Sequence, residues 1–180
     1  GGGTQPALAY STDGINWTIN KQLDPPNTIY GVYAAYSNNL WMVLVQYPNL
    51  LNNQFKVFSS LNGIDWLLIH EIPNADNFIP NSIAYGNGTW VMFGNNQSGT
   101  LVGTVSISTD NGDNWVYKTT PPLSRCFNGF YGNNLWVAVG ETSPPGGSAL
   151  ITSNDNGNTW SQITSFFGNF NGGGSDIFYN

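Results

Sequence analysis

Basic residues are scarce in this sequence. Lys and Arg together number 4 against 10 Asp and Glu, and the formal net charge is −6 at pH 7. Binding to nucleic acid or to an anionic membrane surface needs a positively charged face, which so few basic residues cannot build. The composition therefore argues for no nucleic-acid partner and no membrane partner.

Cysteine, histidine and long apolar runs are almost absent as well. A single cysteine, Cys126, excludes an internal disulfide framework. The chain has only one histidine and one cysteine, too few for a Cys/His zinc site, so no metal and no cofactor is expected. No stretch approaches 18 consecutive apolar residues, which leaves no candidate membrane helix. Charged residues make up 8% and hydrophobic residues 40%, a balance typical of a packed globular chain rather than of disorder.

Asparagine and glycine are abundant, and they belong to a repeat. The chain holds 26 Asn and 22 Gly in 180 residues, which predicts many tight turns. One motif occupies residues 11–17, 60–66, 108–115 and 153–160, and reads S-T-D-G-I-N-W in its first copy and S-N-D-N-G-N-T-W in its last. Its tryptophans lie 49, 49 and 45 residues apart. A second motif, such as Y-G-N-N-L-W-V-A-V at residues 131–139, alternates with the first and contains the other tryptophans, 41, 90 and 136.

Each period predicts four short strands. The Asn/Gly pair of the second motif is typical of a tight hairpin turn, and the Asp/Gly motif predicts a second hairpin. No pattern with helical spacing persists for ten residues. The predicted fold class is all-β, a β-propeller of four-stranded antiparallel blades, because such blades repeat at this period. The predicted units are residues 1–20 (partial), 29–69, 81–118, 126–163 and 175–180 (partial), all within one propeller or propeller segment spanning 1–180.

About 3.7 repeats are therefore expected, with fifteen strands where a ring of four blades needs sixteen. An incomplete blade would leave an exposed strand edge, which propellers avoid. We therefore expect a segment of a larger propeller of six to eight blades, or one that other chains or further repeats complete.

The first motif resembles the Asp-box, or BNR repeat, S-x-D-x-G-x-x-W, of sialidase-like propellers. Residues 153–160 match its fuller form, S-x-D-x-G-x-T-W, at every position. The copies at 11–17 and 60–66 are one residue shorter, and the second has Asn62 where the others have Asp, so tighter but analogous turns are expected. The alternating second motif also resembles repeat arrays in large proteins of giant DNA viruses, although less specifically.

The motif residues are interpreted as structural. Gly can adopt positive φ, and Asp and Ser side chains can accept hydrogen bonds from turn N–H groups. Calcium ligation is the alternative, since D-N-G-D-N at 110–114 resembles part of an EF-hand loop, but the distal Glu is missing. In the family that the motif resembles, the box is a folding element on the face opposite the usual site. The residues assigned this role are Ser11, Asp13, Trp17, Ser60, Asn62, Trp66, Ser108, Asp110, Gly112, Trp115, Ser153, Asp155, Gly157 and Trp160.

Charged residues outside the motifs point to the opposite face. Seven ionisable residues fall in segments interpreted as loops there: Lys21, Asp24, His70, Glu71, Asp76, Arg125 and Glu141. Loops on rigid scaffolds carry function, so a site is sought among them. Candidate catalytic carboxylates are Glu71, Asp76, Glu141 and Asp24, and candidate binding residues are His70, Arg125 and Tyr47. The alternative is that charges simply prefer loops.

The resemblance implies sialidase activity, but a sialidase holds its substrate carboxylate with three arginines, and this chain has only Arg125. The preferred function is a non-catalytic repeat module that is structural or recognises a protein or glycan surface. The alternative is a glycoside hydrolase-like enzyme using two loop carboxylates. A virion or fibre component is a third possibility, and a virion or extracellular location is favoured over the cytoplasm.

Overall fold

The structure is a computed structural model, and it describes residues 8–20, 23, 31–47, 54–73, 76–98, 102–142 and 147–163. The chain divides into two compact units, residues 1–74 and 75–180. Among the described residues every regular element longer than a turn is a strand, and no helix is long and apolar enough to cross a membrane. The assignment of residues 1–180 to one propeller with five repeat units stays a prediction.

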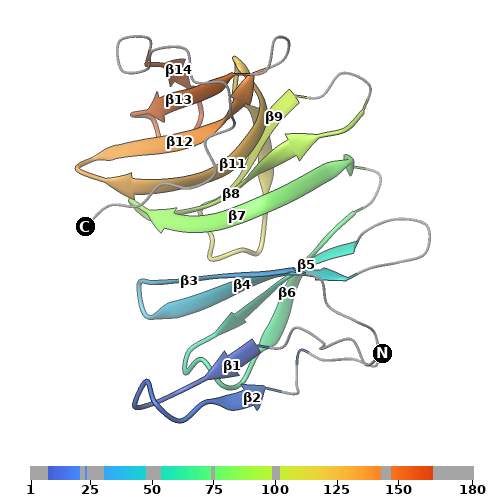
Figure 1. Cartoon of the computed structure of the whole chain (residues 1–180), viewed down its shortest axis with the longest axis vertical. Coiled ribbons are helices and arrows are strands. Elements are labelled where there is room, and N and C mark those ends of the chain that lie inside the picture. The colour runs from blue at the N-terminus through green and yellow to red at the C-terminus, as the bar shows by residue number, and fades with distance from the viewer. Residues whose placement is uncertain are drawn as a thin grey trace. The chain divides into compact units, whose positions relative to one another are not determined.

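The first unit holds a hairpin and one four-stranded antiparallel sheet (Figure 1). The hairpin pairs β1 (Leu8–Tyr10) with β2 (Thr18–Asn20). The sheet contains, in spatial and chain order, β3 (Gly31–Ser37), β4 (Leu40–Tyr47), β5 (Gln54–Ser60) and β6 (Leu67–Ile72). The hairpin packs on one face of this sheet, where Leu8 and Leu23 join a core that includes Val43, Val45 and Trp66.

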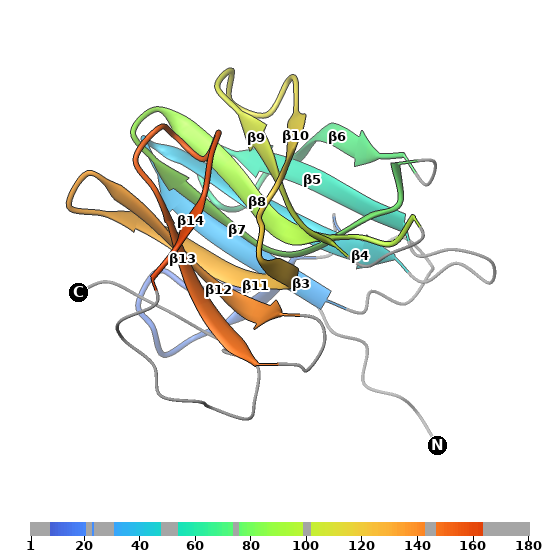
Figure 2. The same ribbon diagram turned by 90° about the horizontal axis from the view of Figure 1, so that it is seen from above.

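The second unit contains two such sheets, which lie face to face (Figures 1 and 2). One sheet contains β7 (Phe78–Gly86), β8 (Thr89–Asn96), β9 (Val102–Ser108) and β10 (Val116–Thr119). The other contains β11 (Leu123–Gly132), β12 (Leu135–Thr142), β13 (Ser148–Ser153) and β14 (Ser161–Gln162). The predicted all-β fold of four-stranded antiparallel sheets is confirmed. The strand expected at 175–180 lies outside the described residues.

Asparagine forms the hairpin turns, which explains its abundance. Within the described part of the chain, all eight non-glycine residues with positive φ are asparagines. In two of the full sheets the first hairpin turns at two such residues, with φ of 53° and 58° at Asn38 and Asn39 and of 49° and 59° at Asn133 and Asn134. In the β7–β10 sheet it turns at Asn87 and Gly88, with φ of 49° and 76°. Two successive positive φ values are typical of the type I′ turn, whose twist matches that of the flanking strands.

The core between the two sheets of the second unit is aromatic at its centre. Phe93 and Trp136 are both 0% exposed, and their ring centroids lie 6.0 Å apart. Phe93 also meets Trp160 edge-on at 6.1 Å. Cys126 is fully buried in the same core, and burial raises the pKa of its thiol far above its ordinary value. Trp136 and Trp160 are thus core residues in this unit and Trp90 is buried as well, whereas Trp115 is only half-buried.

Two strands of the second unit begin earlier than the predicted repeat units. Strands β7 and β11 begin at Phe78 and Leu123, three residues before the predicted unit starts at 81 and 126. Strand β7 contains Pro80, opposite Gly94 at a β-bulge. A proline is tolerated there because β7 is the edge strand of its sheet and the bulge already interrupts the ladder.

Candidate functional site

The four copies of the first motif form the same kind of turn, called here the box turn and comprising residues 11–17, 60–66, 108–115 and 153–160. In the first, Ser11 Oγ donates a hydrogen bond to Asp13 Oδ1 over 2.9 Å and accepts one from Gly14 N over 2.9 Å. Asp13 Oδ1 also accepts from the N–H groups of Ile15 and Asn16 at 2.8 and 2.7 Å. The same serine bond recurs from Ser60 to Asn62 (3.0 Å), Ser108 to Asp110 (2.8 Å) and Ser153 to Asp155 (2.7 Å).

The predicted difference in turn length is visible in the backbone. In the two shorter box turns one residue has positive φ, Gly14 or Gly63, each at 72°. In the longer turn at 108–115 an extra residue, Asn111 at 59°, precedes Gly112 at 95°. The serine oxygen then accepts from the N–H four residues on rather than three, as in the 2.8 Å bond from Gly112 N to Ser108 Oγ. The shorter turns are therefore tighter versions of the same structure.

The box turn at 60–66 has Asn62 where the other three have an aspartate, and Asp65 supplies the carboxylate instead. Asn62 Oδ1 accepts the N–H groups of Ile64 and Asp65 at 2.9 and 2.8 Å, as an aspartate would. Its Nδ2 then donates to Asp65 Oδ2 over 2.8 Å. In the first box turn the amide is three residues later, where Asn16 Nδ2 donates to Asp13 Oδ2 over 2.8 Å. The carboxylate and the amide have exchanged places and the contact is kept.

Hydrogen bonds commit Asp13, Asp110 and Asp155, the aspartates two residues after the serine in three of the box turns, to their ionised form. The backbone N–H of Asn114, its side-chain amide and the Ser108 hydroxyl lower the pKa of Asp110 to about 2. Bonds from Thr159 and Ser153 lower the pKa of Asp155 to about 2. The pKa of Asp13 is likewise well below its ordinary value, chiefly because of the Asn16 N–H. These carboxylates are acceptors within their own turns, which supports the structural interpretation of the motif.

The candidate charged residues do not lie mainly in loops, contrary to the expectation. His70 and Glu71 belong to β6, Arg125 to β11 and Glu141 to β12. The loop interpretation was wrong because cross-strand pairing continues past the points where the apolar pattern ends. Asp76 does lie outside a strand, just before β7, and Lys21 and Asp24 lie outside the described residues.

In the first unit, two candidate residues, Glu71 and Tyr47, lie together with Lys56 at one end of the sheet. Lys56 Nζ contacts Glu71 Oε1 at 2.6 Å across the β5–β6 pair and lies 5.7 Å from the centre of the Tyr47 ring. Tyr47 is 8% exposed, and its hydroxyl donates to Leu23 O over 3.4 Å. His70, the neighbour of Glu71, pairs with Val57 and is half-buried. This group lies at the sheet end opposite the box turn.

Arg125 and Glu141 form the corresponding group of the last sheet. They are register partners on β11 and β12, and Arg125 Nη1 lies 3.1 Å from Glu141 Oε1. The side chains are 47% and 29% exposed, so the pair remains open to solvent on one side. Sequence reasoning named both residues but missed their pairing. Counting outward from the Asn133 and Asn134 turn gives Thr142 as the partner of Arg125, and the bulge between Cys126 and Asn128 shifts the partner to Glu141.

Asp76 is held by two partners from its own sheet. Tyr117 OH on β10 donates to Asp76 Oδ2 over 2.8 Å, and Asn96 Nδ2 on β8 donates to the Asp76 carbonyl over 2.9 Å. Burial, the bond to Asp76 and its negative charge together raise the pKa of Tyr117 well above its ordinary value. Tyr117 is therefore a hydrogen-bond donor at neutral pH and not a nucleophile. It was not among the candidates.

The candidate carboxylates that the structure describes thus contact a lysine, an arginine and a tyrosine rather than one another. Over the described ranges, no group of three or more His, Cys, Asp or Glu side chains lies together so that it could hold a metal ion.

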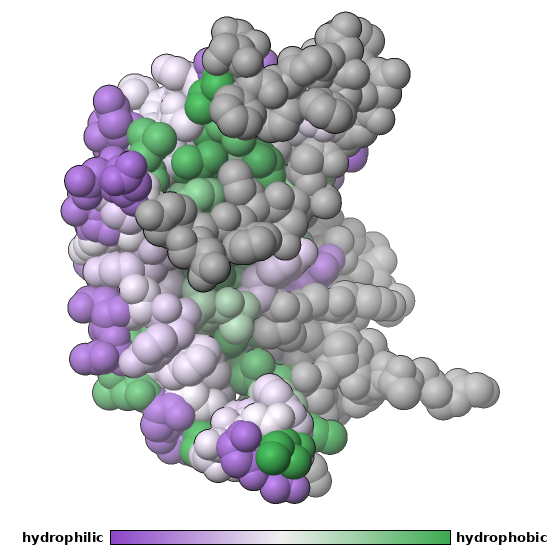
Figure 3. Space-filling model, turned by 60° about the vertical axis from the view of Figure 1, so that its left-hand side comes forward, coloured by the Kyte–Doolittle hydropathy of each residue, from purple (hydrophilic) through white to green (hydrophobic). Residues whose placement is uncertain are grey.

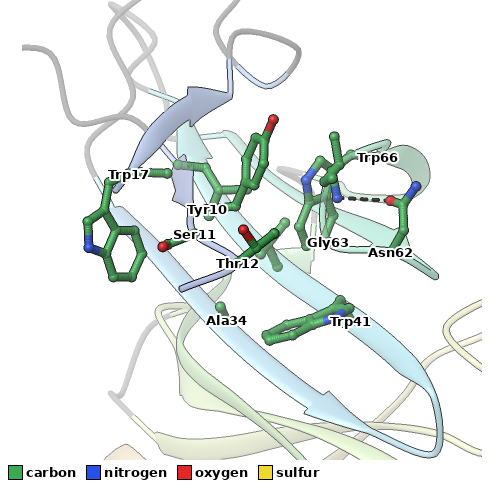
Figure 4. Close-up of a pocket in the computed structure, with 13 residues that line it drawn as sticks. Tyr10, Ser11, Thr12, Trp17, Ala34, Trp41, Asn62, Gly63 and Trp66 are labelled. Atoms are coloured by element: carbon green, nitrogen blue, oxygen red, sulfur yellow. Dashed lines mark hydrogen bonds between the residues drawn. The ribbon is translucent and has the colours of Figure 1, made fainter. Parts of the chain in front are cut away.

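The first unit also has exposed apolar surface and a pocket. At the lower end of Figure 3, where the β1–β2 hairpin lies, hydrophobic residues are exposed beside hydrophilic ones, and Ile15, Trp17 and Ile19 are the large exposed apolar residues of this hairpin. A pocket of about 330 Å³ lies between the hairpin and the β3–β6 sheet. Figure 4 shows Ala34 and Trp41 of the sheet at its floor, with Tyr10 and Trp66 above. None of its lining residues is charged.

No protein-family model and no curated protein matches the sequence. Solved structures do match. The Hadza microbial sialidase Hz136 has a TM-score of 0.61 at 14% identity over 87% of this chain and 39% of its own. Fructan 1-exohydrolase IIa from Cichorium intybus has a TM-score of 0.56 at 15% identity, over 79% of this chain and 33% of its own. The phage phi92 endosialidase has a TM-score of 0.57 at 14% identity, over 76% of this chain and 26% of its own.

At these identities the likeness defines the fold, which is that of a β-propeller with four-stranded antiparallel blades, as in sialidases and glycoside hydrolases. The three full sheets are blades of this kind. The chain spans between about a quarter and two fifths of the length of these three proteins.

Proposed function

We propose that this chain forms part of a glycoside hydrolase-like propeller that handles carbohydrate, with its site at the blade ends opposite the box turns. The observation that carries the proposal is the shared fold: the similar solved structures include two sialidases and a fructan exohydrolase. One fold hosts many functions, so the assignment to carbohydrate is an analogy that the residues must support. We also propose that the box turns belong to the Asp-box class, on the strength of their repeated serine and aspartate bonds.

The residues at those blade ends suit contact with sugar hydroxyls. Charged side chains that remain partly exposed donate and accept strong hydrogen bonds, and the Arg125–Glu141 pair offers both kinds of group on one blade. The Lys56–Glu71 pair offers the same at the corresponding end of the first full blade. The box turns, by contrast, use their polar groups internally and leave little for a ligand.

Within this class, the described residues favour recognition over the chemical step. Hydrolysis by two carboxylates requires them about 5 to 10 Å apart on either side of one bond. Glu71 and Glu141 instead each face a basic residue, and Asp76 faces a tyrosine. The second candidate function is therefore a non-catalytic module that recognises a glycan or protein surface, or one that forms part of a virion. Sialidase activity is not proposed, because one arginine cannot replace three.

One experiment separates the candidates. The protein is applied to a glycan array and assayed in parallel on a panel of aryl glycosides, with Glu141→Gln and Glu71→Gln as variants. Asp113→Asn, an exposed carboxylate in a box turn, is the matched control. Turnover that falls about 100-fold or more in one glutamine variant and is unchanged in the control supports hydrolysis. Glycan binding without turnover supports recognition, and neither binding nor turnover contradicts the carbohydrate proposal.

A further inference from the structure

The pocket of the first unit has a counterpart in the second unit, where it is filled. The two places correspond because the second motif occurs in both, at β3–β4 and at β11–β12, with Tyr36 opposite Trp41 and Tyr131 opposite Trp136. The corresponding residues are Ala34 and Gly129, Trp41 and Trp136, Val43 and Ala138, and Trp66 and Trp160, and all four from the first unit line the pocket.

A side chain from β8 covers this surface in the second unit. The Phe93 ring packs on Trp136 and Trp160 at centroid distances of 6.0 and 6.1 Å. It also lies directly over Gly129, because a Cβ placed on that glycine would fall 2.4 Å from Phe93 Cζ. Phe93 is held in position because β8 pairs with β9, where its partner is Val105. Strand β8 is thus what seals the corresponding surface.

The equivalent covering strand does not occur among the described residues of the first unit. Counting back from the serine that opens each box turn, Leu8 and Tyr10 of β1 correspond to Val105 and Ile107 of β9. Strand β9 pairs on both sides, with β8 and β10, whereas β1 pairs with β2 alone among the described strands. Ala34 is accordingly exposed and Trp41 only half-buried, although Trp136 is 0% exposed.

We propose that the pocket, together with the edge of β1 that has no partner among the described strands, is a docking site for an extended polypeptide strand of the same type as β8. The strand adds antiparallel to β1. A large aromatic side chain opposite Leu8 inserts between Ala34, Trp41 and Trp66, as Phe93 does in the second unit. A second aliphatic side chain, two residues earlier and opposite Tyr10, corresponds to Val91, which pairs with Ile107.

The chemistry of the pocket fits this occupant. Main-chain hydrogen bonds to an exposed strand edge supply affinity, while alternate side chains in pockets supply specificity. The lining has no charged residue, so an ionic ligand would find no partner there. The occupant is therefore an uncharged strand with large apolar side chains at alternate positions, the pattern of V-M-F within residues 89–96. Sugar hydroxyls would meet mostly apolar surface.

The test uses the whole chain and a synthetic peptide with the sequence of residues 89–96, T-W-V-M-F-G-N-N, carrying a fluorescent label. Binding is measured by anisotropy, and hydrogen exchange reports protection of the β1 amides. A second peptide has serine in place of phenylalanine. We expect binding with protection of residues 8–10, and affinity lower by about tenfold or more for the serine peptide, because truncating a buried aromatic anchor is typically this costly.

Two protein variants locate the site. Ala34→Leu adds a side chain to the exposed floor of the pocket and should weaken binding of the phenylalanine peptide by about tenfold or more, and that of the serine peptide much less. Tyr33→Leu is the matched control, on the same strand but outside the pocket lining, and should bind as the unaltered chain does.

Equal binding of the two peptides, or binding that Ala34→Leu leaves unchanged, would overturn the proposal. So would no binding at all, an oligosaccharide that competes for the pocket, or a dimer of the chain that Ala34→Leu dissociates. The carbohydrate proposal concerns the opposite ends of the blades, so its failure and the failure of strand docking are separate results.

Discussion

Replacing Phe93 with alanine tests how the two blades of the second unit are held together. The side chain is 0% exposed and packs on Trp136 and Trp160, so its removal leaves a cavity between rigid aromatic rings that cannot close around it. Such truncations cost about 3 to 5 kcal/mol of unfolding free energy. Denaturant unfolding followed by near-ultraviolet circular dichroism should show this loss. Ile15→Ala, at a position 81% exposed, should change the free energy by less than about 0.5 kcal/mol.

A double-mutant cycle with Gly129 makes the test sharper. A Cβ at Gly129 would lie 2.4 Å from Phe93 Cζ and 2.9 Å from the Val137 carbonyl oxygen, so Gly129→Ala alone should cost about 1 to 3 kcal/mol through overpacking. Once Phe93 is alanine, the first clash is gone and only the second remains. The double variant should therefore lose less than the sum of the two single losses. Strictly additive losses would refute the contact, and a Phe93→Ala loss below about 1 kcal/mol would refute the core assignment.

Three further outcomes follow from the turns and the core. The pKa of Asp110 and of Asp155 is about 2, against an ordinary value of about 4. The stabilisation that the two ionised carboxylates supply is therefore complete above pH 4 and disappears as the pH falls toward 2. The urea concentration at the midpoint of unfolding should fall over that pH range, and it should fall less steeply in Asp110→Asn. Burial raises the pKa of the Cys126 thiol, so a disulfide reagent should label it only on unfolding, and fast labelling of the native chain would contradict its burial. Asn62→Asp places a second carboxylate beside Asp65 and should lower stability by up to about 1 kcal/mol, and adding Asp65→Asn should restore it by recreating the polarity of the first box turn.

The fold was predictable because local chemistry specifies it. Pairs such as Asn133 and Asn134 place positive φ at both central positions of a hairpin, and this sets the register of the flanking strands as far as the first β-bulge. In the second unit, Trp90 and Trp136 of the second motif are buried, so their place in the repeat also marks a buried face. Both signals lie within a few residues of one another, so no knowledge of distant contacts was needed.

The candidate site was predictable only as a list of residues. Arg125 was interpreted as a loop residue because the apolar pattern of its strand does not extend to it. Strand β11 nevertheless begins at Leu123, and a register shift at a bulge makes Glu141 the partner of Arg125. A bulge displaces every later partner by one residue and leaves no reliable mark in the sequence. The pocket could not be foreseen either, since it depends on whether another strand covers Trp41, and that is a question of tertiary structure.

The box turns limit where chemistry can occur. A general acid must hold its proton near the working pH, so an aspartate whose pKa is about 2 cannot serve as one at neutral pH. As a base it is equally poor, because its oxygens already accept hydrogen bonds from the turn that it stabilises. The motif that identifies the fold most clearly is thus unsuited to catalysis. Among the described residues, the carboxylates at the blade ends opposite these turns are Glu71, Asp76 and Glu141, and they are the ones for a hydrolysis assay to test first.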